Sequence, residues 1–461
     1  MEIRAALLSS KINRAHNALQ ESLSLATSLI DLIRPCSDLG IHVDVAVHVE
    51  AANTLWDQGE LSSSIKMLQA LNDEESLKQQ EIRVERYNLL SQIGYQVSVA
   101  RLERGDRVTD NYLKPALKEL RGKTAGSDAG QVFHQFAVFC DEQLQDADNL
   151  ADLERLRKLK EDKQAEVEDM KVLIKAATTT VQRSRYTNHM KKAKTWLDID
   201  AAELTRQIAT QDEFLQQCLE NYLLALTASD DHNPDILRFT ALWLEHADDD
   251  NCIKAVGKYL KNVPSRKFAP LMNQLSSRLQ DNQSAFQNLL YRLVYRICQD
   301  HPYHGMYHVY ASRRSKADAK DETAKSRGDA TAKLAEELKK SPVAPIWQAI
   351  SATNTGYLNL AAERDDRYKQ SSKFKISESE KAEKLNSLLS RCGIPPPTLN
   401  LPLDPTCKYD KVPRMRKLDP NFSIAGGVSA PKILTALGDD GKRYKQLVCA
   451  SLVNKSVADE S

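Results

Sequence analysis

Apolar side chains recur at helical spacing through the first 312 residues of the chain, and this regularity constrains the fold more than any other feature. Three of the stripes share the spacing i, i+3, i+4, i+7 and i+11. They are Phe133, Phe136, Ala137, Cys140 and Leu144; Leu215, Cys218, Leu219, Tyr222 and Leu226; and Phe286, Leu289, Leu290, Leu293 and Ile297. Each stripe makes one apolar face of an α-helix, which must pack against a neighbouring helix. The sequence therefore predicts a mainly α fold.

Two stretches have the layout of helical-hairpin repeats. In residues 50–71, Trp56 precedes a turn at Gly59 and Glu60, and Ile65 and Leu68 begin a returning helix. This is typical of a tetratricopeptide hairpin, in which the glycine permits a tight turn. Residues 236–260 form a weaker copy. Because one hairpin cannot bury its own apolar face, we expect an α-solenoid of TPR/HEAT-like hairpins.

Composition excludes several classes of protein. A formal net charge of +1 over 461 residues gives no basic field for nucleic acid or an acidic membrane surface. We find no apolar run long enough to span a bilayer. The eight cysteines stand singly without a CxxC pair, which is typical of a reducing compartment. We expect Cys140, Cys218 and Cys298 to be buried as small apolar groups.

Charged stretches interrupt the helical pattern. Residues 151–195 could be a basic arm for phosphates, but their interspersed acids favour a long solvated helix with i,i+4 charge pairs. Residues 313–340 lack large apolar side chains almost entirely and predict a flexible linker or an exposed helix. After a short helix at 347–360, the prolines of 393–405 impose an extended segment and mark a boundary.

The end of the sequence carries a different pattern. Gly426 and Gly427 precede Val428, Ser429, Ala430, Pro431 and Lys432, and β-type runs at 433–437 and 443–448 flank the turn Gly438–Gly441. A double glycine exposes backbone N–H groups of the kind that close over phosphates. Most such turns, however, only join strands.

The order of these motifs resembles the start of the catalytic domain in the phosphatidylinositol-kinase-related protein kinases, most of all the ataxia-telangiectasia-mutated (ATM) branch. The matching segments in the tail are AGGV at 425–428, PKI at 431–433, GDDG at 438–441 and QLV at 446–448. Upstream segments are similar to landmarks of that branch's FAT domain, the helical solenoid that wraps the kinase. They are FAVFCD at 136–141, RYT at 185–187, LWLE at 242–245, KFAPL at 267–271 and DHPYH at 300–304.

The resemblance implies a domain organisation. Residues 1–312 correspond to the FAT solenoid, and 313–419 to a charged linker, helices and a proline-rich connector. Residues 420–448 correspond to the incomplete start of a PI3K/PI4K-type catalytic domain, followed by a dissimilar tail at 449–461.

The resemblance also implies a function. A full-length relative uses ATP and Mg²⁺ to phosphorylate Ser or Thr followed by Gln, in DNA double-strand-break checkpoint signalling and telomere maintenance. It acts in the nucleus, and also in the cytoplasm, forms homodimers, and reaches DNA ends through protein partners that bind the solenoid. The carried-over site is the nucleotide-covering loop Gly426, Gly427, Val428, Ser429, Ala430, Pro431 and Lys432. No catalytic or metal-binding residue is carried over.

The departures from the family pattern decide what we expect of this chain. The strand lysine of the family would follow Gln446-Leu447-Val448, where this sequence has Cys449, and no DDLRQD segment follows. Because phosphoryl transfer depends on positive charge at the phosphates, we expect the chain alone to be inactive and to hold no ATP. Val448-Cys449 can be encoded by GTATGT, a sequence that resembles a fungal intron donor, so a retained intron or a wrong gene model is one explanation of the tail.

Two alternatives remain. His301, His304 and His308 have a spacing that could gather imidazoles for zinc, but no further ligand completes a tetrahedral set, and Asp300 with Pro302 favours a helix start. We therefore predict no metal site. The alternative function is a non-catalytic helical-repeat scaffold for protein–protein interaction, which the hairpins alone would support.

Overall fold

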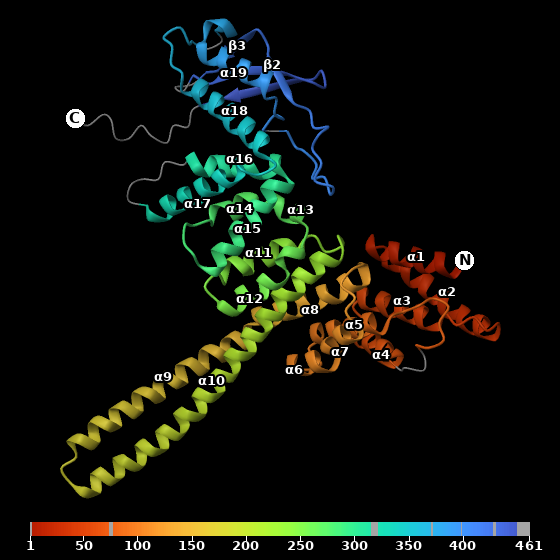
Figure 1. The fold of residues 1–461 in the computed structure, drawn as a ribbon. Helices are drawn as coiled ribbons and strands as arrows, with labels where there is room; N and C mark the ends of the chain where they lie inside the picture. The colour runs from red at the N-terminus through yellow and green to blue at the C-terminus, as the bar shows by residue number, and fades with distance from the viewer. Residues whose placement is uncertain are drawn as a thin grey trace. The chain divides into compact units, whose positions relative to one another are not determined.

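The structure is a computed structural model that describes residues 2–72, 77–314, 321–369, 372–397, 399–426 and 430–449. It divides into two compact units, Met1–Val263 and Pro264–Ser461. Helices make up nearly all of the first unit, and a small sheet lies at the end of the second (Figure 1). The predicted mainly α fold with a β-type end is confirmed.

The first unit begins as a row of short helices that turn back on one another. They are α1 (Glu2–Ala15), α2 (Leu19–Asp38), α3 (Asp44–Asp57), α4 (Leu61–Leu71), α5 (Arg86–Val99), α6 (Gly105–Val108), a π-helical turn η1 (Thr109–Leu113), α7 (Lys114–Glu119) and α8 (Ser127–Gln145). Gly59 joins α3 to α4 with a φ of 87°, a conformation that favours glycine. The predicted tetratricopeptide-type hairpin is therefore present, with Ile65 and Leu68 buried on α4.

Two long helices form an antiparallel hairpin in the same unit. These are α9 (Ala147–Ala176) and α10 (Thr180–Ala228), which pack side by side (Figure 1). The side chain of Asp146 caps α9, and that of Thr179 caps α10. Ion pairs such as Lys163–Glu166 lie on the surface of α9. The single solvated helix predicted for 151–195 is wrong in one respect, because the chain turns at 177–179.

The second hairpin copy closes the first unit. It consists of α11 (Asp235–Glu245) and α12 (Asp250–Tyr259), followed by the 3₁₀ turn η2 (Leu260–Asn262). Phe239 and Trp243 are fully buried, with ring centroids 6.0 Å apart. As predicted, the stripe of α10 from Leu215 to Leu226 is buried.

The second unit starts with helices as well. They are α13 (Ser265–Phe268), η3 (Ala269–Leu271), α14 (Met272–Ser277), α15 (Ala285–Asp300), α16 (Pro302–Arg314), α17 (Glu322–Leu338) and α18 (Ala344–Ala362). Helix α17 falls in the stretch predicted to be a linker or an exposed helix. One of its faces is instead buried, through Ala330, Thr331, Leu334, Ala335 and Leu338. Leu334 and Leu338 supply the large apolar side chains of this face, and the small side chains between them allow close packing.

A five-stranded antiparallel sheet completes the described part of the chain. Its strands are β1 (Lys373–Lys375), β2 (Met415–Leu418), β3 (Asn421–Ile424), β4 (Lys432–Gly438) and β5 (Arg443–Val448), with η4 (Ile376–Glu378) and α19 (Glu380–Arg391) between β1 and β2. The order is β1-β3-β4-β2, and β5 pairs with β4. Helix α19 packs between α18 and β2.

Two sequence expectations can be compared with the whole described chain. Cys140, Cys218 and Cys298 are buried, and burial raises the pKa of all three thiols. Among the described residues, no helix is both long and apolar enough to cross a membrane.

Candidate functional site

The predicted nucleotide-covering loop is the turn between β3 and β4. The strands pair Ser423 with Ile433 and Ile424 with Lys432, and the Ala425 N–H donates to the Pro431 carbonyl at 2.8 Å. Of the seven predicted residues, Gly427, Val428 and Ser429 lie outside the described residues. Gly426 is exposed, and Ala430 adopts a φ of 44°. The hairpin geometry thus brings Gly426, Ala430, Pro431 and Lys432 to one end of the sheet.

Lys432 has a structural position that the sequence did not indicate. Its side chain is fully buried, and Nζ donates to the carbonyls of Ala361 at 3.2 Å and Glu363 at 2.7 Å. These carbonyls lie at the C-terminal end of α18. The last carbonyls of a helix have no N–H partner within the helix, and a cation can donate to them. Nζ also lies 5.3 Å from the centre of the Tyr368 ring. Burial lowers the pKa of Lys432. The contact of Lys432 with a nucleotide stays a prediction.

The turn between β4 and β5 was predicted correctly. Gly438 N–H donates to the Lys442 carbonyl at 2.9 Å, and Gly441 has a φ of 74°. A Cβ on Gly438 would come 2.8 Å from a ring carbon of Tyr444. The tyrosine hydroxyl in turn donates to Asp440 at 2.8 Å. Both glycines are therefore required by the geometry of this turn.

Strand β5 is tied to α18 through Gln446. The Tyr357 hydroxyl donates to Oε1 of Gln446 at 2.6 Å, and Nε2 of Gln446 lies 3.0 Å from Sδ of Met415. Sequence reasoning missed Tyr357, since nothing in its local pattern separates it from other residues on the helix. The QLV motif therefore carries a contact that holds the sheet to its helix.

A cavity of about 400 Å³ lies between α18 and the end of β5. Leu358 and Leu447 on its wall are 43% and 62% exposed. Cys449, which stands where the resemblance implies a lysine, also lines it and is exposed. At this wall the chain offers a thiol in place of a cation.

Two of the three histidines considered for zinc lie within hydrogen-bond distance of other groups. His301 Nδ1 lies 2.6 Å from the Tyr409 hydroxyl, and His304 Nε2–H donates to the Leu401 carbonyl at 3.0 Å. Burial lowers the pKa of both His301 and His308. His301 and His304 thus hold the loop that contains Leu401 and Tyr409.

Another group combines residue types that bind metals. In the described part of the chain, His134, His232 and Asp235 place ligand atoms within 4.8 Å of one another. His134 Nδ1 lies 2.7 Å from Asp235 Oδ2, and the two imidazoles stack with centroids 4.0 Å apart and planes 9° from parallel. A bound metal lies near the plane of each ligating ring, and two stacked parallel rings cannot both satisfy this. The arrangement is an imidazole stack on a carboxylate rather than a metal centre.

Comparison with known proteins identifies the family. No family model matches the chain. The chain is 52% identical over 97% of its length to serine/threonine-protein kinase tel1 of Neurospora crassa and 50% identical over 97% to TEL1 of Gibberella zeae. It spans only 15% of the length of each of these relatives.

Solved structures agree with the sequence relatives. The open conformation of CtTel1 matches with a TM-score of 0.90 and 52% identity, over 97% of this chain and 16% of that one. The FAT and kinase domain of CtTel1 matches with a TM-score of 0.88 and 51% identity, over 96% and 30%. A CtTel1 dimer with C2 symmetry matches with a TM-score of 0.89 and 51% identity, over 97% and 16%. By sequence and by fold, the chain belongs to the Tel1 family of ATM-type kinases, as the segment that spans FAT helices and the first strands of the kinase N-lobe.

Proposed function

We propose that the chain is part of a serine/threonine protein kinase that, as a whole protein, uses ATP and Mg²⁺ to phosphorylate Ser or Thr followed by Gln. The setting of this activity is DNA double-strand-break checkpoint signalling and telomere maintenance, in the nucleus and also in the cytoplasm. The supporting observation is the 52% identity to Neurospora crassa tel1 over 97% of the chain.

The contribution of this segment is a helical platform for proteins, followed by the beginning of the nucleotide site. A net charge of +1 provides no field for direct attraction of DNA, so recruitment to DNA ends runs through protein partners. Homodimer formation is supported by the C2-symmetric CtTel1 dimer among the similar structures.

In this proposal the 461-residue chain does not transfer phosphate by itself. Cys449 stands at the lysine position, and a thiol supplies no positive charge to the phosphates of ATP. The loop Gly426–Lys432 covers nucleotide only when the rest of a two-lobed cleft is present, because burial in the cleft and metal ligands supply most of the affinity.

A chimera tests the proposal. Residues after Val448 are replaced by the corresponding C-terminal region of Neurospora crassa tel1, and phosphate transfer from radiolabelled ATP is measured on a Ser-Gln peptide and a matched Ser-Ala peptide. We expect the chimera to label only the Ser-Gln peptide. We expect the 461-residue chain and its Cys449→Lys variant to label neither.

The outcomes separate the two functions. Labelling by the 461-residue chain would contradict its inactivity, and equal labelling of both peptides by the chimera would contradict the proposed specificity. A folded chimera that labels neither peptide favours the non-catalytic scaffold.

A further inference from the structure

A polar groove crosses the first unit between α1, α3, α5 and α8. Its cavity has a volume of about 590 Å³, within the range of pockets that hold ligands. Side-chain amides dominate its wall: Asn53, Asn88, Gln92, Gln96, Gln131 and Gln135. Five charged side chains complete the polar part of this wall: Lys11, Arg14, Arg83, Glu85 and Asp128.

Helical spacing brings these amides together. Asn88, Gln92 and Gln96 follow one another at i, i+4 and i+8 on α5. Gln131 and Gln135 repeat the i, i+4 spacing on α8. Residues four apart lie on one face of a helix, so two helices each present a row of amides to the same cavity.

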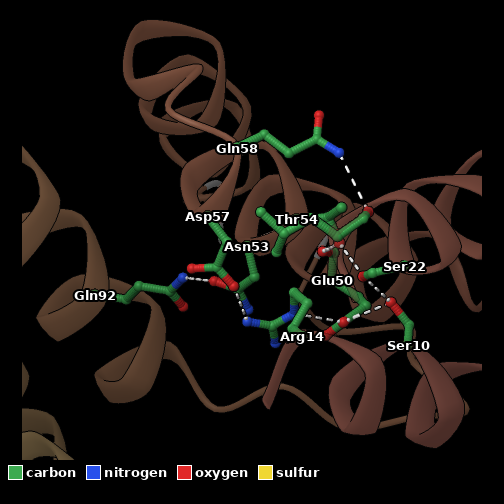
Figure 2. Close-up of polar contacts among 10 residues, drawn as sticks. Ser10, Arg14, Ser22, Glu50, Asn53, Thr54, Asp57, Gln58 and Gln92 are labelled. Carbon is green, nitrogen blue, oxygen red and sulfur yellow. Dashed lines mark hydrogen bonds and ion pairs between the residues drawn. The ribbon is translucent and has the colours of Figure 1, made fainter. Parts of the chain in front are cut away.

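The protein fixes the orientation of several amides through their oxygens. Ser64 donates to Oε1 of Gln96 at 2.9 Å, and Ser91 donates to Oε1 of Gln135 at 2.5 Å. Figure 2 shows the hydrogen bond that Nε2 of Gln92 donates to Oδ1 of Asn53. Within the described part of the chain, the amide nitrogens of Gln96 and Gln135 have no acceptor. Two donors are thus held in place and left for a ligand.

Asn88 adds an acceptor to these donors. Its Oδ1 is buried and, among the described residues, has no hydrogen-bond partner. A buried polar atom without a partner destabilises the fold, so such atoms usually mark a ligand or an ordered water. The groove therefore offers both fixed donors and an unsatisfied acceptor.

Two of the three cations that line the groove, Arg14 and Arg83, are paired within the protein. Arg14 binds Glu50 at 2.9 Å and Asp57 at 3.0 Å, as Figure 2 shows. Arg83 pairs with Glu85 at 2.9 Å. A phosphate or nucleic-acid ligand would need uncommitted cations. The third cation, Lys11, shares the wall with Asp128, so the groove carries no concentrated positive charge and recognition depends mainly on neutral hydrogen bonds.

Two aromatic side chains supply an apolar wall in the same groove. Trp56 on α3 and Tyr95 on α5 line the cavity, with ring centroids 6.4 Å apart and planes tilted by 55°. Both are half-buried and can accommodate an apolar side chain against their rings.

We propose that this groove binds an extended peptide segment of a partner protein through its main chain. A peptide backbone alternates N–H donors with C=O acceptors, and amide side chains complement both. In this complex, the amide nitrogens of Gln96 and Gln135 donate to peptide carbonyls, Asn88 accepts from a peptide N–H, and an apolar residue rests on Trp56 and Tyr95. This deepens the proposed role of the solenoid in binding proteins and does not depend on kinase activity.

The test uses the 461-residue chain and a library of random dodecapeptides displayed on phage. Enriched peptides are synthesised with a fluorescent label, and their affinity is measured by fluorescence anisotropy. We expect the double variant Asn88→Ala/Gln135→Ala to bind about tenfold more weakly, since it removes one acceptor and one donor that bind the peptide main chain. The matched control is Gln20→Ala, an exposed amide on α2 that lies outside the groove.

A second series separates main-chain recognition from other modes. Peptides with single N-methylated bonds lose an N–H donor without a change of side chain, and we expect one or more of these positions to abolish binding. The circular dichroism spectra of the variants must match that of the parent chain. The proposal is overturned if no peptide is enriched, or if every N-methylated peptide binds as well as its parent. It is likewise overturned if the double variant keeps full affinity, or if high salt removes the binding.

Discussion

Lys432, which follows the glycine turn, has two candidate roles: its ammonium group either caps the end of α18 or binds the phosphates of a nucleotide. In the structure it donates to the carbonyls of Ala361 and Glu363 at the end of α18. We expect Lys432→Met to lower the free energy of unfolding by about 1–3 kcal/mol, because two acceptors lose a charged donor. Urea unfolding followed by circular dichroism measures this loss.

The control for this change is Lys417→Met on β2, an exposed lysine for which no ion pair is observed among the described residues. It should leave stability nearly unchanged. If Lys432→Met is as stable as the parent chain and instead lowers nucleotide binding in the tel1 chimera, the capping role is wrong and the phosphate role is right.

We expect the buried His301 and the half-buried His308 to make the second unit sensitive to acid. Burial lowers the folded-state pKa of His301 and His308 below the ordinary value of about 6.5. Below that pH the unfolded chain binds more protons than the folded chain, so stability falls as the pH decreases. Above about pH 7 both states are neutral at these residues, and the effect disappears.

We expect the double variant His301→Gln/His308→Gln to lose less stability than the parent chain between about pH 7 and pH 5. The measurement is urea unfolding at each pH, with the exposed residue His16 changed to Gln as the control. Parallel pH profiles for all three proteins would show that other groups govern the acid response.

At the scale of elements, Asp141 joins three helices. Its carboxylate accepts from Arg238 of α11 at 2.6 and 2.7 Å and from the Tyr222 hydroxyl of α10 at 3.2 Å. It belongs to α8 and is 6% exposed. The FAVFCD landmark therefore ends in a residue that fixes the packing of α8, α10 and α11.

We expect Asp141→Asn to lower the free energy of unfolding by about 1–3 kcal/mol, because the amide keeps the shape but cannot accept two bonds from the guanidinium. Thermal unfolding by calorimetry measures the loss. The matched control is Asp148→Asn, whose side chain is 86% exposed and pairs with Arg101 at 3.5 Å. A surface pair of this kind contributes about 0–1 kcal/mol, and equal effects at both positions would contradict the proposed role of Asp141.

Elements with a strong apolar stripe could be predicted from the sequence, while elements defined by tertiary contacts could not. The apolar stripes of α8, α10 and α15 predicted these helices correctly, because the helical spacing of the apolar residues agrees with the face that is buried. The turn at 177–179 was missed because it contains neither glycine nor proline. Thr179, its cap, was the available signal. Helix α19 was also missed, although Ser379 as cap and the stripe of Ala382, Leu385 and Leu389 indicate it.

The same distinction holds for the candidate site. The glycine turns and both strands of the last hairpin could be predicted, because turn chemistry is local. The contact of Lys432 with the end of α18 could not, since it depends on how a helix some seventy residues earlier approaches the sheet. The amide rows of the groove were visible as i, i+4 pairs, but their common cavity appears only when α5 and α8 are packed together.

At the scale of the whole molecule, the sheet presents an edge. Among the described residues β5 pairs with β4 alone, and Leu447 on β5 is 62% exposed. An edge strand with an exposed apolar side chain is a template for pairing with another chain. We therefore expect the 461-residue chain to associate increasingly as its concentration rises.

A lysine at the edge should oppose this association, because two charged edges repel each other and the apolar contact is lost. We expect Leu447→Lys to sediment as a smaller species than the parent chain at the same high concentration, measured by sedimentation velocity. The control is Val172→Lys, an apolar residue that is 64% exposed on α9 rather than on a strand. If Val172→Lys disperses the assembly and Leu447→Lys does not, association runs through the long helical hairpin and the edge-strand prediction is wrong. If only Leu447→Lys disperses it, the open edge of β5 is the surface at which the sheet recruits another strand.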